Sequence, residues 1–297
     1  MGDPPILAIF DEANAAQAAD SVLLASISKG DRAALEELVL RHQAWIYNIA
    51  LRMLGNAMDA EDATQEIFIK AITKLATFKG GSEFRTWLYR IAKNHLLSMA
   101  RRPMEDYFPS FDRHAEVLRE TPDSEPVDEK SPTPYHRLLV EETKRECMAG
   151  MLLCLDRTQR LVFILGGVFG INGNVGGEIM EMSPENFRQI LSRSRMELSR
   201  YMNEECGLAN PVNPCRCERK TRAMIELGYV DPERLRFDDG HIERVSSFVE
   251  ANAAMADDAL ELRAQGLFRD SPFLKSRDFM AALVEKFGWE KFELGGW

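Results

Sequence analysis

Apolar residues recur every three or four positions through most of the chain, which predicts amphipathic helices that pack by one face. The pattern is clearest in two neighbouring helices expected at 59–75 and 84–102, joined by a turn at Gly80-Gly81. Asp59 is placed to cap the first helix, and Pro103 ends the second. Their inward faces are formed by Ala60, Ala63, Ile67, Phe68, Ala71, Ile72 and Leu75, and by Trp87, Leu88, Ile91, Ala92, Leu96 and Met99.

The outward faces of these two helices differ in charge. The first presents Asp62, Gln65, Glu66, Ile69 and Lys70. The second presents Arg90, Asn94, Leu97 and Arg101 as one stripe, with Lys93 beside it. Segment 79–102 holds six basic residues and one acid, although the 297-residue chain has a net charge of −10. Basic residues with interleaved aromatics indicate a nucleic-acid-binding surface, and the alternative is a solvated helix face over a core.

The helical pattern extends to both sides of this pair. Two helices are expected between 21 and 54, with Asp31 capping the second and Gly55-Asn56 ending it. Helices resume at Tyr135, and Asp156 caps a further one. The fold class is therefore all-α. We divide the chain into a flexible N-terminus (1–20), a helical domain (21–102), a linker (103–134), a second helical domain (135–205) and a helical C-terminal extension (206–297).

The second helical domain ends in a helix-turn-helix pattern. Ser183-Pro184-Glu185 is a strong helix start: a cap, a proline at the first helical position and an acid in the first turn. In the first two turns lie Asn186, Arg188 and Gln189, whose side chains suit base edges. Arg193, Arg195 and Arg200 lie further along and suit phosphates. The preceding segment, 166–177, is rich in glycine, so the first helix of this motif is expected to be short or loosely packed.

The linker and the extension differ in composition from the two domains. Segment 103–134 contains six prolines, and its nine acids outnumber three bases, so it is expected to be mostly extended or disordered. By composition alone, this linker fits a solvated spacer. The extension begins with Cys206, Cys215 and Cys217, which suggest zinc ligation, although the spacing is not that of a regular zinc finger. The alternative is three reduced thiols, with no cofactor bound.

Several classes of protein are excluded by composition. The chain has no apolar run long enough to span a membrane and no basic segment at its start, so a cytoplasmic protein is expected. Its five cysteines, an odd number, argue for free thiols. The five histidines are scattered and suggest no catalytic triad, so the chain is not expected to be an enzyme.

The stretch DAEDATQEIFIKA, followed by FKGGSEFRTWLYRIAKN and a closing Arg-Arg pair, resembles region 2 of bacterial RNA polymerase sigma factors. The similarity covers about 31–102 and is greatest to the extracytoplasmic-function (ECF) group. It implies that the polymerase clamp is bound by Asp62, Gln65, Glu66 and Ile69. It implies that the −10 promoter element is bound by Lys79, Ser82, Phe84, Arg90, Lys93, Asn94 and Arg101.

The helix-turn-helix resembles sigma region 4, which contacts the −35 promoter element. The resemblance implies DNA contacts from Ser183, Asn186, Arg188, Gln189, Arg193 and Arg195. Two positions depart from the family pattern: Ile190 stands where arginine is usual, and Glu181 stands where the turn glycine is usual. Core RNA polymerase and promoter DNA are the implied partners, and an anti-sigma factor is a further candidate.

Two alternatives stay open from the sequence. One is a helix-turn-helix regulator that works without polymerase. The other is a sigma module gated by its C-terminal extension, which would sense a ligand or a partner. Segment 225–297 has nine bases and fifteen acids, and an acidic extension of this kind could dock on a basic DNA-binding face or contact polymerase.

Overall fold

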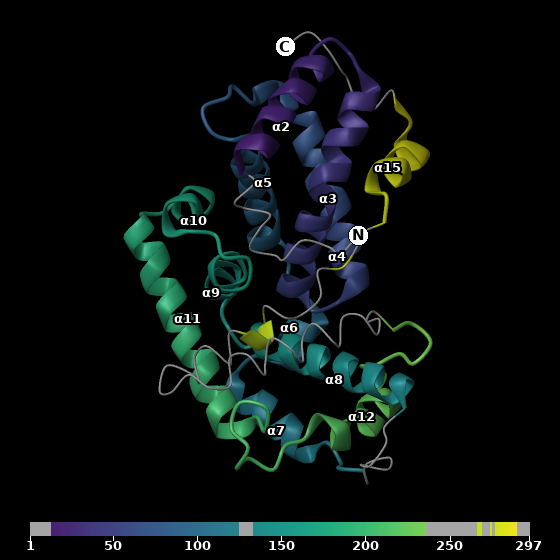
Figure 1. The fold of residues 1–297 in the computed structure, drawn as a ribbon, viewed down its shortest axis with the longest axis vertical. Coiled ribbons are helices and arrows are strands. Elements are labelled where there is room, and N and C mark those ends of the chain that lie inside the picture. Colours follow the sequence, from purple (N-terminus) through teal and green to yellow (C-terminus); the bar gives the residue numbers. More distant parts are fainter. Residues whose placement is uncertain (1–12, 125–132, 236–265, 269–273, 275–276, 290–297) are drawn as a thin grey trace. The chain divides into compact units, whose positions relative to one another are not determined.

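The computed structural model describes residues 13–124, 133–235, 266–268, 274 and 277–289. Figure 1 shows an all-helical fold, and within these ranges the only β-type pairing is an isolated bridge between Cys206 and Cys215. The chain divides into two compact units. Unit one comprises 1–100, 164–189 and 273–297, and unit two comprises 101–163 and 190–272.

Unit one is built on four antiparallel helices and a short 3-10 turn: α2 (Ala13–Ile27), α3 (Arg32–Leu54), α4 (Ala57–Thr73), η1 (Leu75–Thr77) and α5 (Phe84–Ser98). Ile46, Met53, Ile67 and Leu88 are completely buried between them. The predicted cap at Asp31 is confirmed, since its carboxylate accepts from the Ala34 N–H at 3.2 Å. Gly55 ends α3 in the left-handed conformation, with φ 68°.

Two predicted helix ends in unit one are wrong. The side chain of Asn56, not Asp59, caps α4, because its Oδ1 accepts from the N–H groups of Met58 and Asp59. Asp59 lies in the first turn, where its charge still favours the positive end of the helix. The second helix stops at Ser98 because Met99 turns to extended backbone, with φ −60° and ψ 146°.

Two later segments complete unit one. α10 (Gly173–Met180) precedes the start of α11 (Pro184–Glu205), and α15 (Phe279–Phe287) packs on α3 and α4. The first helix of the helix-turn-helix is short, as expected. A Cβ on Gly176 would lie 2.4 Å from the Phe187 ring, so glycine is required for α10 to approach α11 this closely.

Unit two contains α6 (Pro103–Tyr107), α7 (Phe111–Glu120), α8 (Pro134–Leu153), α9 (Arg157–Val162), most of α11, and α12 (Cys217–Glu226); the π-helical turn η2 (Phe163–Val168) crosses the boundary between the units. In α9 the predicted cap at Asp156 is confirmed, with Gln159 completing a capping box. α12 packs on α8, so this part of the extension belongs to the fold of unit two.

The expectation of an extended linker is wrong for α6 and α7. Glu105 in α6 is 1% exposed and binds two guanidinium groups, accepting from Arg157 Nε and Arg160 Nη1, each at 2.9 Å. Burial opposes ionisation of Glu105, but its hydrogen bonds, that from Arg157 foremost, lower its pKa to about 2. A buried ion pair therefore fastens the acidic segment to α9. Segment 125–132 lies outside the described residues.

The two ends of the chain are described only in part. The N-terminus predicted to be flexible includes the first turns of α2, which begins at Ala13, and 1–12 lie outside the described residues. In the extension, the sequence predicts a helix at 225–237, but the helix present there, α12, ends at Glu226 and turns follow from 227 to 235. α15 lies within the helix expected at 276–294, and most of the helix expected at 241–268 lies outside the described residues. No helix among the residues described is both long and apolar enough to cross a membrane.

Candidate nucleic-acid interface

The predicted polymerase-binding residues lie together on the outer face of α4. Asp62 and Glu66 are exposed, while Gln65 and Ile69 are half-buried. Their spacing of three, four and seven residues places them on one side of the helix. The opposite side carries the completely buried Ala60 and Ile67, so this face looks away from the core of unit one.

The loop before α5 rests on an aromatic cluster. The Phe84 ring lies 5.7 Å from that of Phe78 and 5.6 Å from that of Trp87. Phe84 is 7% exposed and also contacts His42, so it supports the loop from the core. Lys79 is exposed and Ser82 is half-buried on the loop itself. Gly80 adopts φ 71°, which makes the predicted turn possible without steric cost.

The basic face of α5 is partly covered, which the helical pattern alone did not predict. Arg90 Nη2 lies 2.7 Å from Glu178 Oε1, and Arg90 Nε donates to the Glu178 carbonyl oxygen at 3.0 Å. Lys93 Nζ pairs with Glu181 Oε2. The Lys93 side chain is only 8% exposed, so its predicted position on an open face is corrected. Asn94, on the same helix, is exposed.

Glu181 combines an unusual backbone with this ion pair. It ends α10 with φ 56° and is the only non-glycine residue with positive φ among the described residues. The hydrogen bond and the positive charge of Lys93 hold the pKa of the Glu181 carboxyl below its usual range. Glu178 was missed by sequence reasoning. The signal available for Glu181 was its place where the related turns carry glycine.

Arg101 belongs to unit two, whereas the other predicted −10 residues belong to unit one. Its Nε is 3.1 Å from Asp106 Oδ1, and its Nη2 donates to the Glu105 carbonyl oxygen at 3.0 Å. Arg101 thus helps to fix α6 within unit two. Arg90, Lys93 and Asn94 share α5 of unit one.

The predicted −35 residues begin at the start of α11. Ser183 caps this helix, its Oγ accepting from the Asn186 N–H at 3.1 Å. Asn186, Gln189 and Arg193 are exposed and share one side of α11. Arg188 is exposed and pairs with Glu185, one turn earlier, at 2.8 Å, while Arg195 is half-buried. The first turns of α11 therefore present amide and guanidinium groups of the kind that contact base edges.

The cysteines do not assemble a metal centre. The main chains of Cys206 and Cys215 pair in the isolated β-bridge, but their side chains form no disulfide. All three predicted ligands, Cys217 included, are free thiols. Within the described ranges, no three His, Cys, Asp or Glu side chains are arranged to hold a metal ion, which corrects the predicted zinc site. Burial raises the pKa of Cys217 to about 12, so this thiol is protonated at neutral pH.

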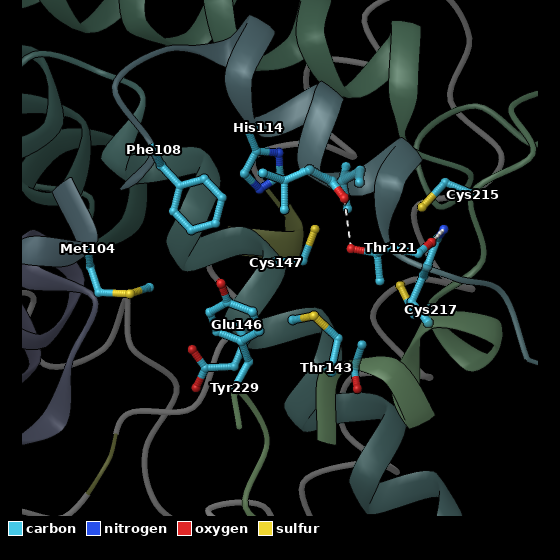
Figure 2. Close-up of a pocket in the computed structure, with 14 residues that line it drawn as sticks. Met104, Phe108, His114, Thr121, Thr143, Glu146, Cys147, Cys215, Cys217 and Tyr229 are labelled. Carbon is cyan, nitrogen blue, oxygen red and sulfur yellow. Dashed lines mark hydrogen bonds between the residues drawn. The ribbon is translucent and has the colours of Figure 1, made fainter. Parts of the chain in front are cut away.

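Two of these thiols line a cavity of about 40 Å³ in unit two, together with Cys147. Figure 2 shows His114 and Phe108 on another side of the same pocket. Burial lowers the pKa of His114 to about 4, and a hydrogen bond with the main chain of Cys147 offsets this only in part. His114 is therefore neutral at physiological pH. Its Nδ1 forms a hydrogen bond with the Tyr201 hydroxyl, so the ring is a structural element of unit two.

Comparison with known proteins identifies relatives of the first helical domain. The Sigma-70 region 2 family profile matches residues 38–104. RNA polymerase sigma-H factor of Pseudomonas aeruginosa is 44% identical over 91 residues, which are 29% of this chain and 47% of that protein. The chain thus spans about half the length of that relative.

A second relative is matched over nearly its whole length. The ECF RNA polymerase sigma-E factor of Escherichia coli K12 is 32% identical over 183 residues, which are 60% of this chain and 92% of that protein. Among solved structures, CnrH in complex with the cytosolic domain of CnrY gives a TM-score of 0.45 at 22% identity, over 63% of this chain and 98% of that one. RpoE in complex with the anti-sigma factor NepR from Bartonella quintana gives a TM-score of 0.37 at 17% identity, over 57% of this chain and 96% of that one.

Proposed function

Because the chain belongs to the extracytoplasmic-function sigma factors of bacterial RNA polymerase, we propose that it binds core polymerase and directs it to specific promoters by contacting the −35 element and opening the −10 element. Sigma factors are subunits of polymerase and not enzymes by themselves. Core polymerase and promoter DNA are the proposed partners, and an anti-sigma factor is a third. One observation carries the proposal: unit one presents an acidic outer face on α4 and a basic face with an exposed amide on α5.

The α4 face is the proposed contact with the polymerase clamp. Asp62 and Glu66 lie one turn apart and are both exposed, so their carboxylates could each meet an arginine of the partner. Charge-assisted hydrogen bonds between carboxylates and guanidinium groups are among the stronger polar contacts at protein interfaces. Gln65 and Ile69 add an amide and an apolar side chain beside them.

The α5 face and its preceding loop are the proposed −10 contact. Unstacking a base costs a few kcal/mol, and capture of the flipped base in a pocket offsets that cost. Asn94 is exposed and carries an amide that can hydrogen-bond a base edge. Lys79, Arg90 and Lys93 would contact the phosphates of the separated strand. Phe84 would act indirectly, by supporting the loop from the core.

The first turns of α11 are the proposed −35 contact. Asn186 and Gln189 suit adenine, and Arg188 suits guanine, because their paired polar groups match the major-groove edges of these bases. Arg193 and Arg195 would contact phosphates and fix the helix in register. Arg188 is held in an exposed pair with Glu185, which DNA can displace at small cost.

The proposal is tested by co-purification with core polymerase. The double variant Asp62→Arg with Glu66→Arg reverses both carboxylates on the exposed side of α4 and should abolish binding while leaving the helical fold intact. The matched control is Glu36→Arg with Glu37→Arg, which makes the same change of charge on exposed positions of α3. Retention of core polymerase by the α4 variant would refute the assignment. Tight binding of promoter duplex without polymerase would favour the polymerase-independent regulator instead.

A further inference from the structure

Two carboxylates of the helix-turn-helix lie on two cations of the α5 face. Glu178 is in the last turn of α10, and Glu181 is the residue that ends it. They pair with Arg90 and Lys93, residues 88 positions earlier in the sequence. All four residues belong to unit one. The pairs therefore join the turn that precedes the recognition helix to the helix that is proposed to bind the −10 strand.

The geometry fits mutual neutralisation. Arg90 makes two contacts with Glu178, one to the carboxylate at 2.7 Å and one to the carbonyl oxygen at 3.0 Å. Lys93 is almost completely buried beneath α10, and a buried ammonium needs a counter-ion. Glu181 supplies that counter-ion from a side chain that is itself 60% exposed. Lys93 is buried in this contact, the Arg90 side chain stays 31% exposed, and Asn94 is exposed.

The backbone at Glu181 indicates that a glutamate is present there for its side-chain contact with Lys93, because the turn itself does not need a carboxylate. With φ 56°, this position is one that glycine adopts without steric cost and that other residues adopt under strain. Glycine would make the same turn but would leave Lys93 unpaired. Strained residues persist where the surrounding structure holds them in place, and the ion pair with Lys93 is a contact made at this strained position.

We propose that Glu178 and Glu181 form an acidic clip, which occupies the phosphate-binding cations Arg90 and Lys93 in the free protein and must open before the −10 strand binds. This inference rests on the proposed function, because it assigns regulation to the same α5 face. The carboxylates hold the positions that phosphate oxygens would take. Free sigma would thus bind single-stranded DNA weakly, and opening of the clip would release two cations on α5 and the turn before α11 together.

The test uses the full chain with Glu178→Gln and Glu181→Gly. Gln keeps the main-chain contact of residue 178, and Gly fits the positive φ at 181, so the variant is expected to fold. Binding of a fluorescein-labelled single-stranded oligonucleotide of mixed sequence is followed by anisotropy, without polymerase, over a range of salt. Two freed cations should steepen the slope of log K against log salt by about 1.4, since each phosphate contact on a single strand contributes about 0.7. The affinity at low salt should rise about tenfold.

Two further variants make the result specific. Glu36→Gln with Glu37→Gln removes the same charge from exposed positions on α3 and should leave the salt slope unchanged. Adding Lys93→Gln to the clip variant should remove about half of the gained slope. If Glu181→Gly prevents folding, Glu181→Gln carries the same test. An unchanged affinity and slope in a folded clip variant would overturn the clip, as would an equal gain in the α3 control.

Different results would refute the proposed function and the clip. Failure of the full chain to bind core polymerase would refute the proposed function without touching the oligonucleotide result. A chain that binds and programmes polymerase, but whose clip variant binds single-stranded DNA no better than wild type, would refute the clip alone.

Discussion

The side chain of Asn48 forms a two-way hydrogen bond with the main chain of Leu274. Asn48 Nδ2 donates to the Leu274 carbonyl oxygen at 2.8 Å, and its Oδ1 accepts from the Leu274 N–H at 3.0 Å. Close by, Gln43 Oε1 accepts from the Phe279 N–H at 2.9 Å. Two amide side chains of α3 thus hold the segment that leads into α15, and Figure 1 shows α15 against α3.

Asn48→Ala should weaken this attachment. Loss of the amide leaves the Leu274 N–H and carbonyl without their partner, at a cost of about 1–3 kcal/mol in the free energy of unfolding. Hydrogen exchange of the α15 amides should accelerate, and urea denaturation should give the stability change. Asn48 also donates to the Ala44 carbonyl, so the same substitution is made in a chain ending at residue 272. If Asn48→Ala lowers the free energy of unfolding by as much in the shortened chain, the loss does not come from the hydrogen bonds to Leu274.

Glu105→Gln should destabilise unit two. The substitution leaves Arg157 and Arg160 near each other without the carboxylate that both contact. Removing one partner of a buried ion pair costs about 3–5 kcal/mol. The control is Glu116→Gln in α7, whose pair with Arg113 is exposed and should contribute little to stability because solvent screens it. Denaturant unfolding of both variants measures the difference, and equal small effects would contradict the role given to Glu105.

Unit two should lose stability as the pH falls through the range set by His114. Its pKa is about 4 in the fold and 6.5 in the unfolded chain, so the unfolded state binds the proton first. The stabilisation is fully present above pH 6.5 and declines towards pH 4, by about 3 kcal/mol in total. Chemical denaturation at several pH values measures this. His114→Gln should flatten the pH dependence, and an unchanged slope in that variant would assign it to other groups.

Asn94→Ala should impair promoter opening more than duplex binding, because the exposed amide is proposed to hold a base that is available only after strand separation. With core polymerase, permanganate reactivity of unpaired thymines should fall about tenfold, while retention of duplex promoter on a filter changes little. Ser98→Ala, at an exposed position on the last turn of α5, is the control. Equal loss in both measurements would exclude base capture.

Several local features of this fold followed from local rules, although the caps and ends of α4 and α5 were misplaced. Asp31, Asp156 and Ser183 cap their helices as predicted, because a cap is recognised within three residues of sequence. Gly55 and Gly80 take the positive φ that their turns require. The grouping of Asp62 and Glu66 on one face followed from the helical period alone.

Features that depend on distant partners did not follow. α6 and α7 looked like an extended linker because their composition is acidic and rich in proline. Glu105, however, finds Arg157 and Arg160 more than fifty residues later. Lys93 is likewise buried against a distant partner, Glu181. Helical periodicity predicts which residues share a face of one helix, and it does not predict contacts with a segment 88 residues away. The cysteine spacing suggested a metal site, but burial left protonated thiols around an apolar pocket.

The most direct test of the central proposal is run-off transcription with core polymerase. The template should carry a promoter selected from genomic fragments by the reconstituted holoenzyme. Wild-type protein should give a discrete transcript, Asp62→Arg with Glu66→Arg should give none, and Glu36→Arg with Glu37→Arg should match wild type. Absence of any wild-type transcript in the presence of bound core polymerase, or full activity of the α4 variant, would contradict the assignment of this chain as a promoter-directing sigma factor.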